Sequence, residues 1–243
     1  MKVALISDVH GNLEALTAVL EDIHKQSRAD EIFFLGDAVG YGANPNEVLR
    51  LIKAECRVKI MGNHDYSALG LLDTSDFNAY ARSAITFTAS VLDSESVGVL
   101  SSFKLKDTHG DMFLVHATPE QPEAWNYCLS LGEADRQFQH FEERICFLGH
   151  SHKPIVYARN FAGEAYSIGG REIDLEKEYR YIINTGSVGQ PRDGDPRACY
   201  VVLDADAGRI SYRRVEYDLA AAQAKMAAVD LPEFLIERLA SGK

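Results

Sequence analysis

The chain begins with the stretch MKVALISDVHGN (residues 1–12), in which a short apolar run stops at a carboxylate and a histidine. Val3–Ser7 has the length of a buried strand and is far too short for a secretory or membrane-spanning segment. Asn12 is a favourable N-cap, and apolar residues recur at helical spacing after it. This stretch therefore predicts a strand, a polar turn that carries Asp8 and His10, and a helix.

The same unit, an apolar run followed by polar residues, recurs along the first two thirds of the chain. A second helix is predicted after Pro45, which suits a first helical turn, and a third over residues 76–92. Strands that alternate with helices favour βαβ units and a largely parallel sheet. The further strands predicted in this part are Ile32–Leu35, Val58–Met61, Met112–Val115 and Ile145–Leu148.

The pattern changes at Pro154, where short strands follow one another without intervening helices. Polar turns at 160–164 and 204–208 separate some of them, which predicts an antiparallel second sheet. Residues 219–241 are predicted to form a helical region broken near Pro232, suited to packing or to contact with a partner. The strands predicted here are Ile155–Ala158, Ala165–Ile168, Tyr179–Ile183, Cys199–Leu203 and Ile210–Val215.

Length and composition indicate an ordinary globular protein. The 243 residues, 46% of them hydrophobic, fit one α/β domain over residues 1–243, with a candidate helical insertion around 66–100. A net charge of −11 argues against nucleic acid and anionic membranes as partners. The four cysteines are widely spaced and form no C-x-x-C pair, which favours neither a zinc knuckle nor a redox site and indicates a cytoplasmic location.

Metal-binding residue types follow the predicted strands at their carboxyl ends. Five of the eight histidines lie in these groups, and Gly36, Gly62 and Gly149 come directly before polar members. Strand ends in open α/β sheets converge on one crevice, so residues far apart in sequence are predicted to share a site. The groups are Asp8 and His10, Asp37, Asn63 with His64 and Asp65, His116, and His150 with His152.

These groups, in the order Asp8-x-His10, Gly36-Asp37, Gly62-Asn63-His64-Asp65, His116 and Gly149-His150-Ser151-His152, resemble the calcineurin-like metallophosphoesterase family, in particular its small prokaryotic phosphodiesterase-like branch. The resemblance covers residues 1–152 by motif. It implies an α/β four-layer sandwich of two mixed β-sheets flanked by helices, with a dinuclear metal centre. It also implies that Asp8, His10, Asp37 and His152 hold one cation, and that Asp37, Asn63, His116 and His150 hold the other.

The chemistry implied by this family requires these residue types. A carboxylate offers two oxygens and can bridge two cations, while Asn63 adds a neutral carbonyl oxygen. We predict that His64 stabilises or protonates the leaving oxygen and that Asp65 orients its imidazole, the alternative being a structural role for His64. Imidazole and oxygen ligands without a thiolate favour Mn²⁺, with Fe, Zn, Ni or Co as alternatives.

The sequence is less informative about the substrate. Arg192 or Arg197, after the predicted strand that ends near Asn184, is a candidate for binding a substrate phosphate, although both also suit a solvated turn. The third motif lacks the arginine of the protein phosphatases, which favours a phosphodiesterase or phosphatase for small soluble, nucleotide-like esters. A protein phosphatase, a nuclease and a non-catalytic interaction scaffold remain as alternatives.

Overall fold

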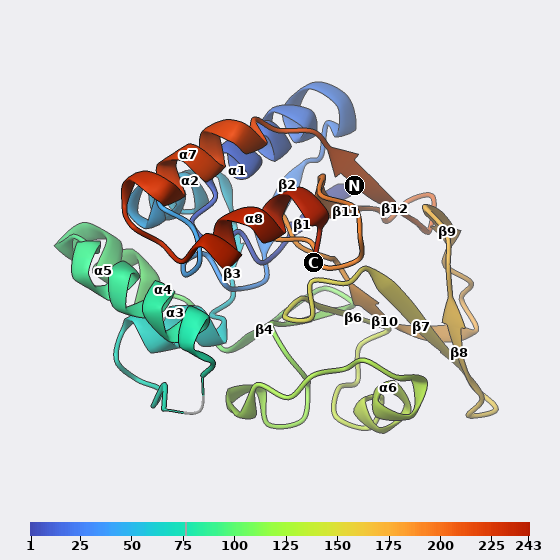
Figure 1. The fold of residues 1–243 in the computed structure, drawn as a ribbon. Helices are drawn as coiled ribbons and strands as arrows, with labels where there is room; N and C mark the ends of the chain where they lie inside the picture. Colours follow the sequence, from blue (N-terminus) through green and yellow to red (C-terminus); the bar gives the residue numbers. More distant parts are fainter. Residues whose placement is uncertain (76) are drawn as a thin grey trace.

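A computed structural model describes residues 1–75 and 77–243 of the chain. It contains two six-stranded sheets that face each other, with helices on the outer side of each (Figure 1). Sheet I has the order β3 (Val58–Lys59), β2 (Glu31–Phe34), β1 (Lys2–Ile6), β11 (Ala198–Asp204), β12 (Arg209–Val215) and β9 (Glu172–Asp174). Sheet II has the order β4 (Lys106–His109), β5 (Met112–Val115), β6 (Ile145–Leu148), β10 (Tyr179–Asn184), β7 (Ile155–Asn160) and β8 (Ala165–Ile168).

Both sheets are mixed, as predicted for the fold class. In sheet I, β1 runs parallel to β2 and antiparallel to β11. In sheet II, β10 runs parallel to β6 and antiparallel to β7. The carboxyl ends of the parallel strands β1, β2, β5 and β6 therefore deliver their loops to the same edge of the sandwich.

Alternating side chains build the four layers. Leu5 and Phe33 point into the space between the sheets, where they pack with Phe147 of sheet II. Their neighbours Ile6 and Phe34 point to the opposite face of sheet I and join the helices there. This alternation is the period of two expected for strands that are buried on both faces.

The helices pack on the outer faces of the two sheets (Figure 1). Asn12 caps α1 by accepting a hydrogen bond from the Ala15 amide at 3.1 Å, and Pro45 is the first residue of α2. The outer helices α1, α2 and α7 cover sheet I, and α6 lies under sheet II (Figure 1). The helical segments are α1 (Leu13–Asp22), η1 (Ile23–Ser27), α2 (Pro45–Glu55), α3 (Asn63–Ala68), α4 (Ala79–Val91), α5 (Ser94–Leu100), η2 (Pro122–Ala124), α6 (Leu131–Gln137), α7 (Leu219–Ala228) and α8 (Glu233–Ser241).

The prediction of a separate antiparallel sheet after Pro154 is wrong. The strands β7, β8 and β10 extend sheet II, whereas β11 and β12 return to sheet I, where Lys2 pairs with Asp204. Alternation identifies a strand but not its partner, because pairing depends on contacts between residues more than a hundred positions apart. The polar strands β4 and β9 were not predicted.

Two predictions about helical segments can be compared with the structure. The helix predicted over 76–92 corresponds to α4, while Asp76 lies outside the described residues. The predicted break near Pro232 is present, because this proline precedes α8.

The four cysteines are buried and free. Among the helices of 1–75 and 77–243, none is long and apolar enough to span a membrane.

Candidate metal centre

The loops after the three strands β1, β2 and β6 adopt an unusual backbone conformation. Asp8, His10, Asp37, His150 and His152 all have a positive φ, between 50° and 65°. Residues other than glycine rarely adopt this left-handed region, and holding each one there costs about 1–3 kcal/mol. Five of the seven residues predicted to bind metal thus have a backbone that the surrounding structure forces into place, as is typical of functional sites.

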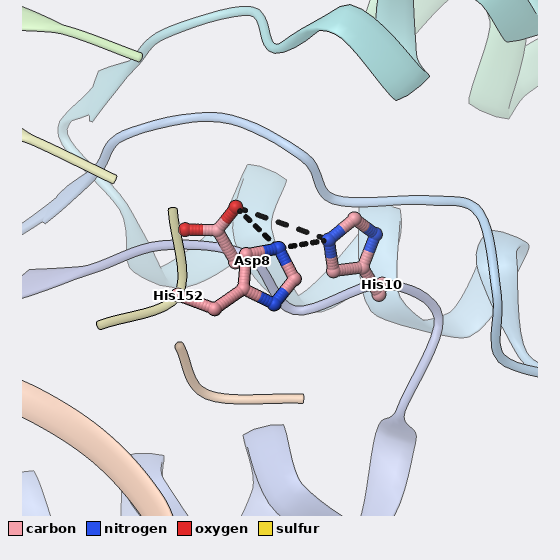
Figure 2. Close-up of side chains that lie close together, drawn as sticks. All are labelled: Asp8, His10 and His152. Atoms are coloured by element: carbon pink, nitrogen blue, oxygen red, sulfur yellow. Dashed lines mark hydrogen bonds and ion pairs between the residues drawn. The ribbon is translucent and has the colours of Figure 1, made fainter. Parts of the chain in front are cut away.

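The first group of side chains consists of Asp8, His10 and His152, which come from the loops after β1 and β6 (Figure 2). The Nε2 atom of His152 lies 3.2 Å from Oδ1 of Asp8, and Nε2 of His10 lies 3.8 Å from the same oxygen. The two Nε2 atoms are 3.0 Å apart. All three side chains are almost completely buried.

The second group is built around Asp37, which follows β2. Its Oδ2 atom lies 3.3 Å from Nε2 of His116 and 3.6 Å from Nε2 of His10. His150 belongs to the same group, since a ring nitrogen of His150 lies within 4.8 Å of the ligand atoms of Asp37 and His116. Asp37 is therefore placed between the two groups, as expected of a bridging carboxylate.

Backbone carbonyls fix the orientation of four imidazoles. One ring nitrogen of each lies at hydrogen-bonding distance from a carbonyl oxygen, to which it donates, so the other nitrogen presents a lone pair when the imidazole is neutral. Ligand histidines of metal sites show this arrangement. The pairs are His10 with Val39 at 3.0 Å, His116 with Leu35 at 2.8 Å, His152 with Gln190 at 2.6 Å, and His150 with Trp125 at 2.9 Å.

This donor set fits divalent cations. Asp8 Oδ1, Asn63 Oδ1 and His116 Nε2 are buried polar atoms without a hydrogen-bond partner among the described residues. The facing Nε2 lone pairs of His10 and His152, 3.0 Å apart, also require a positive charge between them. Cations would satisfy all these groups, and a mixture of imidazole and oxygen donors suits transition metals.

Charges within the group shift several pKa values. Burial opposes ionisation of Asp37, but the nearby imidazoles of His116 and His64 outweigh it and hold the pKa of Asp37 well below its usual range. Burial would lower the pKa of His116, yet the carboxylates of Asp37 and Asp8 raise it to about 9. Burial lowers the pKa of His10 and His152. The two carboxylates thus remain ionised and attract positive charge.

Two glycines leave space for the carboxylates. A Cβ atom on Gly62 would lie 2.1 Å from Oδ1 of Asp37, and one on Gly149 would lie 2.5 Å from Oδ2 of Asp8. Both distances are far below van der Waals contact, so any side chain at these positions would displace a carboxylate. At these two positions glycine is needed because the backbone approaches a carboxylate closely.

Asp65 does not orient the imidazole of His64, contrary to our prediction from the sequence. Its carboxylate accepts hydrogen bonds from the amides of Asp37, Ala38, Val39 and Gly62, at 2.8 to 3.2 Å. Asp65 therefore fixes the loop that carries Asp37. Adjacent residues in a helix point in different directions, which explains why sequence proximity was misleading.

We expect Asp65→Asn to destabilise the fold, because the amide NH₂ group would face backbone donors that now have an acceptor. Leaving buried donors unpaired costs about 1–3 kcal/mol of the free energy of unfolding. Urea denaturation of the variant and of Asp73→Asn, an exposed aspartate in a surface loop, would measure the difference. Equal stability of the two variants would contradict this role.

His64 differs from the four carbonyl-bound histidines. Its Nδ1 atom is buried and has no hydrogen-bond partner among the described residues. The ring packs against Tyr41 and His10, with centroids 4.5 and 4.8 Å apart. Burial lowers the pKa of His64 to about 4, so the ring is neutral at pH 7. His64 thus adjoins both groups of side chains. It lacks the hydrogen bond to a backbone carbonyl that orients the other four histidines.

Arg192 and Arg197, the two candidates for binding a substrate phosphate, differ in the contacts of their guanidinium groups. Arg197 binds Asp195 through both Nε and Nη2, at 2.9 and 2.6 Å, so its guanidinium is already paired. Arg192 donates from Nη2 to the neutral Gln190 at 2.8 Å, and its Nε atom is buried without a partner among the described residues. Its guanidinium lies 5.7 Å from the ring centroid of Tyr41. The structure therefore favours Arg192 over Arg197 as an anion-binding residue.

Sequence reasoning missed two tyrosines that adjoin the group. Tyr41 packs against His10 with ring centroids 4.7 Å apart, and Tyr127 stacks on His150 at 4.1 Å. Tyr127 is 48% exposed, so it lies at the surface of the site. Neither residue directly follows a predicted strand, and tyrosine is common at protein surfaces, so no sequence pattern singled out either residue.

Comparison with known proteins agrees with this geometry. A family model described as a calcineurin-like phosphoesterase superfamily domain matches residues 1–208. An uncharacterised protein of Methanocaldococcus jannaschii is 42% identical over 99% of this chain and 98% of its own length. The crystal structure of a metallophosphoesterase from Sphaerobacter thermophilus superposes with a TM-score of 0.87 at 40% identity, covering 100% of this chain and 99% of the other.

A more distant relative matches only part of the chain. The symmetrical bis(5′-nucleosyl)-tetraphosphatase of Erwinia tasmaniensis is 32% identical over 84 residues, which is 31% of this chain and 31% of that protein. The match over 1–208 and the relatives that span nearly the whole length agree with the resemblance seen in the motifs. The chain therefore belongs to the calcineurin-like phosphoesterase superfamily.

Proposed function

We propose that this protein is a dinuclear metal-dependent hydrolase of phosphate esters that acts on small, soluble, nucleotide-like substrates. Membership of the phosphoesterase superfamily supports hydrolysis of a phosphate ester. The observation that carries the two-metal proposal is the set of four carbonyl-bound imidazoles that surround the buried carboxylates Asp8 and Asp37. Such an arrangement is costly without cations and suited to them.

In this proposal Asp8, His10, Asp37 and His152 hold one cation, and Asp37, Asn63, His116 and His150 hold the other. When bound, two divalent cations would supply Lewis acidity and make a water nucleophile available near neutral pH. Mn²⁺ is the favoured metal, with Fe, Zn, Ni or Co as alternatives. Asp65 acts as a positioning residue through the loop of Asp37.

Arg192 and His64 would contact the substrate. Arg192 lies beside Tyr41 with its Nε atom unpaired among the described residues, and it would hold an oxygen of the phosphate. His64 is neutral at pH 7 and carries one N–H, which would stabilise the leaving oxygen as the ester bond breaks. The substrate, rather than Asp65, would then orient the imidazole.

The net charge, one relative and the cysteines bear on the class of substrate and on the cellular location. The net charge of −11 disfavours long polyanions, and a relative over part of the chain is a dinucleoside tetraphosphatase. Four free, buried cysteines agree with a reducing compartment, so we propose a cytoplasmic enzyme. A protein phosphatase is the second candidate, because the same centre could act on a phosphopeptide.

An activity matrix tests this proposal. The metal-stripped protein would be reconstituted with each metal and assayed on aryl mono- and diesters, cyclic nucleotides, dinucleoside polyphosphates, single-stranded oligonucleotides and phosphopeptides. We expect metal-dependent turnover that is highest on small nucleotide-like esters. Preference for phosphopeptides or oligonucleotides would favour the rival activities, and failure to hydrolyse any ester would favour a non-catalytic scaffold.

Metal uptake should release a proton. The pKa of His116 is raised to about 9 in the metal-free protein, so at pH 7 this histidine is protonated and must lose its proton to bind a cation. The apparent affinity should therefore rise with pH and level off near pH 9. Calorimetric titration in buffers of different ionisation enthalpy would count the protons, and uptake without release at pH 7 would contradict this assignment.

A further inference from the structure

The loop between β5 and α6, residues 116–130, passes along one side of the candidate metal centre. It begins at His116, and the carbonyl oxygen of Trp125 accepts a hydrogen bond from Nε2 of His150 at 2.9 Å. The ring of Tyr127 stacks on the ring of His150, with centroids 4.1 Å apart and 17° between the two planes. This β5–α6 loop therefore contacts a proposed metal ligand through both a backbone group and a side chain.

Contacts at both ends hold the β5–α6 loop in place. The amide of Glu120 donates to Oε1 of Gln137, a buried side chain of α6, at 2.9 Å. Cys128, the residue after Tyr127, is buried in an apolar cluster formed by residues of sheet II and α6. Trp125 has a φ of 54°, a left-handed conformation that is rare for a bulky residue and persists only where the surrounding structure holds it. Tyr127 is thus presented by a well-anchored loop.

The ring of Tyr127 has one covered face and one exposed face. Tyr127 is 48% exposed, whereas His150 beneath it is buried. Because one face of the phenol ring lies on the imidazole, the exposure belongs to the opposite face and to the edge of the ring. A single exposed ring is ordinary on a protein surface, but this one lies directly on a side chain of the proposed active site. A substrate held there would have an aromatic face next to it.

Trp125 adds a polar group to the same loop. Its ring has Tyr66 and His116 as neighbours, with centroids 5.7 and 6.3 Å away. Its Nε1 atom is buried and has no hydrogen-bond partner among the described residues. A buried donor without an acceptor is unfavourable, so this N–H group calls for a water molecule or a ligand beside the ring. The β5–α6 loop therefore offers an exposed aromatic face and an unsatisfied donor beside the second group of proposed metal ligands.

We propose that the exposed face of Tyr127 stacks on a nucleobase of the substrate, so that the preferred esters are those of nucleosides. This inference rests on the proposed hydrolase function, which places the scissile phosphate at the metal centre beside His150. A single sugar joins a base to its 5′-phosphate, so a ring that lies on a metal ligand is well placed to meet the base. Stacking needs only the planar face that every base has. Phosphate esters of sugars and polyols lack such a face, and Tyr127 would discriminate against them.

The test compares two ligands of the metal-loaded protein that differ only in the base. Adenosine 5′-monophosphate (AMP) carries adenine where ribose 5-phosphate carries a hydroxyl group, and their inhibition constants would be measured against hydrolysis of bis(p-nitrophenyl) phosphate. Tyr127→Leu keeps an apolar side chain but removes the ring. We expect it to raise the inhibition constant of AMP by about 5-fold or more, which corresponds to about 1 kcal/mol of stacking, and to change that of ribose 5-phosphate far less. Tyr127→Phe, which keeps the ring, should recover most of the affinity for AMP.

Fluorescence gives a second readout that does not require turnover. The chain contains a single tryptophan, so its emission reports on Trp125 in the β5–α6 loop alone. At saturation AMP should quench this emission more than ribose 5-phosphate does, because only AMP places a base beside the loop. Tyr127→Leu should raise the concentration of AMP that half-saturates the quenching, in parallel with its effect on the inhibition constant.

Controls separate this inference from the function on which it rests. Tyr166→Leu changes another exposed tyrosine, on β8, where its hydroxyl donates to Glu164, and it should affect neither ligand. If Tyr127 only supported His150, Tyr127→Leu would weaken both ligands equally and lower the metal content. That result, or equal affinity of the wild type for AMP and ribose 5-phosphate, would overturn the inference. Absence of metal-dependent turnover on every ester, with AMP still preferred in the fluorescence titration, would instead refute the proposed function.

Discussion

Asp37→Asn should reduce turnover roughly 10³-fold or more, because both proposed cations depend on this side chain. Removal of one hydrogen-bond donor that stabilises a transition state usually costs less, about 10²–10³-fold. Asparagine keeps an acceptor for the His64 amide, which donates to Oδ1 of Asp37 at 2.9 Å. It replaces Oδ2, which faces His116 and His10, by an NH₂ group that cannot bind a metal. Steady-state kinetics with saturating Mn²⁺ would measure the loss.

The matched control for Asp37→Asn is Asp107→Asn, which changes the same functional group on β4, where Asp107 is partly exposed and pairs with Lys104. The control should retain full activity. Metal analysis should show that the Asp37 variant retains less than two equivalents while its circular dichroism is unchanged. Turnover within a few-fold of the wild type at normal metal content would show that Asp37 is no bridge.

His64→Ala should have an effect that depends on the leaving group. A hydrogen-bond donor to the developing negative charge contributes about 10²–10³-fold where the leaving oxygen is strongly basic, and little where it leaves readily as a nitrophenolate. Plotting log kcat against leaving-group pKa for the wild type and the variant would therefore give a steeper line for the variant. Burial lowers the pKa of His64 to about 4, so the imidazole is neutral at pH 7, and its N–H would stabilise the leaving oxygen by a hydrogen bond rather than transfer a proton to it.

His24→Ala is the control for this experiment, because His24 lies on the surface and pairs with Glu55. It should leave the slope unchanged. A uniform loss with His64→Ala on all leaving groups would indicate a structural role, as would reduced metal content. Full activity on every ester would exclude His64 from the reaction.

The sequence was most informative where structure is local. Val3–Ser7 and the residues after it predicted β1, the polar turn and α1, because strand length, N-cap and helical spacing are properties of a few neighbouring residues. The motif residues were also brought together as expected, since the ends of parallel strands converge. Local patterns therefore predicted both the class of fold and the location of the site.

Long-range pairing and side-chain direction were harder to predict. The return of β11 to the side of β1 depends on register between the two ends of the chain, which leaves no local pattern. Asp65 was assigned to His64 because they are neighbours, although its carboxylate serves the loop of Asp37.

The central claim is that a pair of cations shares Asp37, and anomalous diffraction from crystals of the Mn²⁺-loaded protein measures this most directly. Two anomalous peaks are expected, one beside Asp8, His10 and His152 and one beside His116, His150 and Asn63, with Asp37 in contact with both. A single peak at full occupancy in a fully active crystal preparation, or peaks away from these residues, would contradict the account.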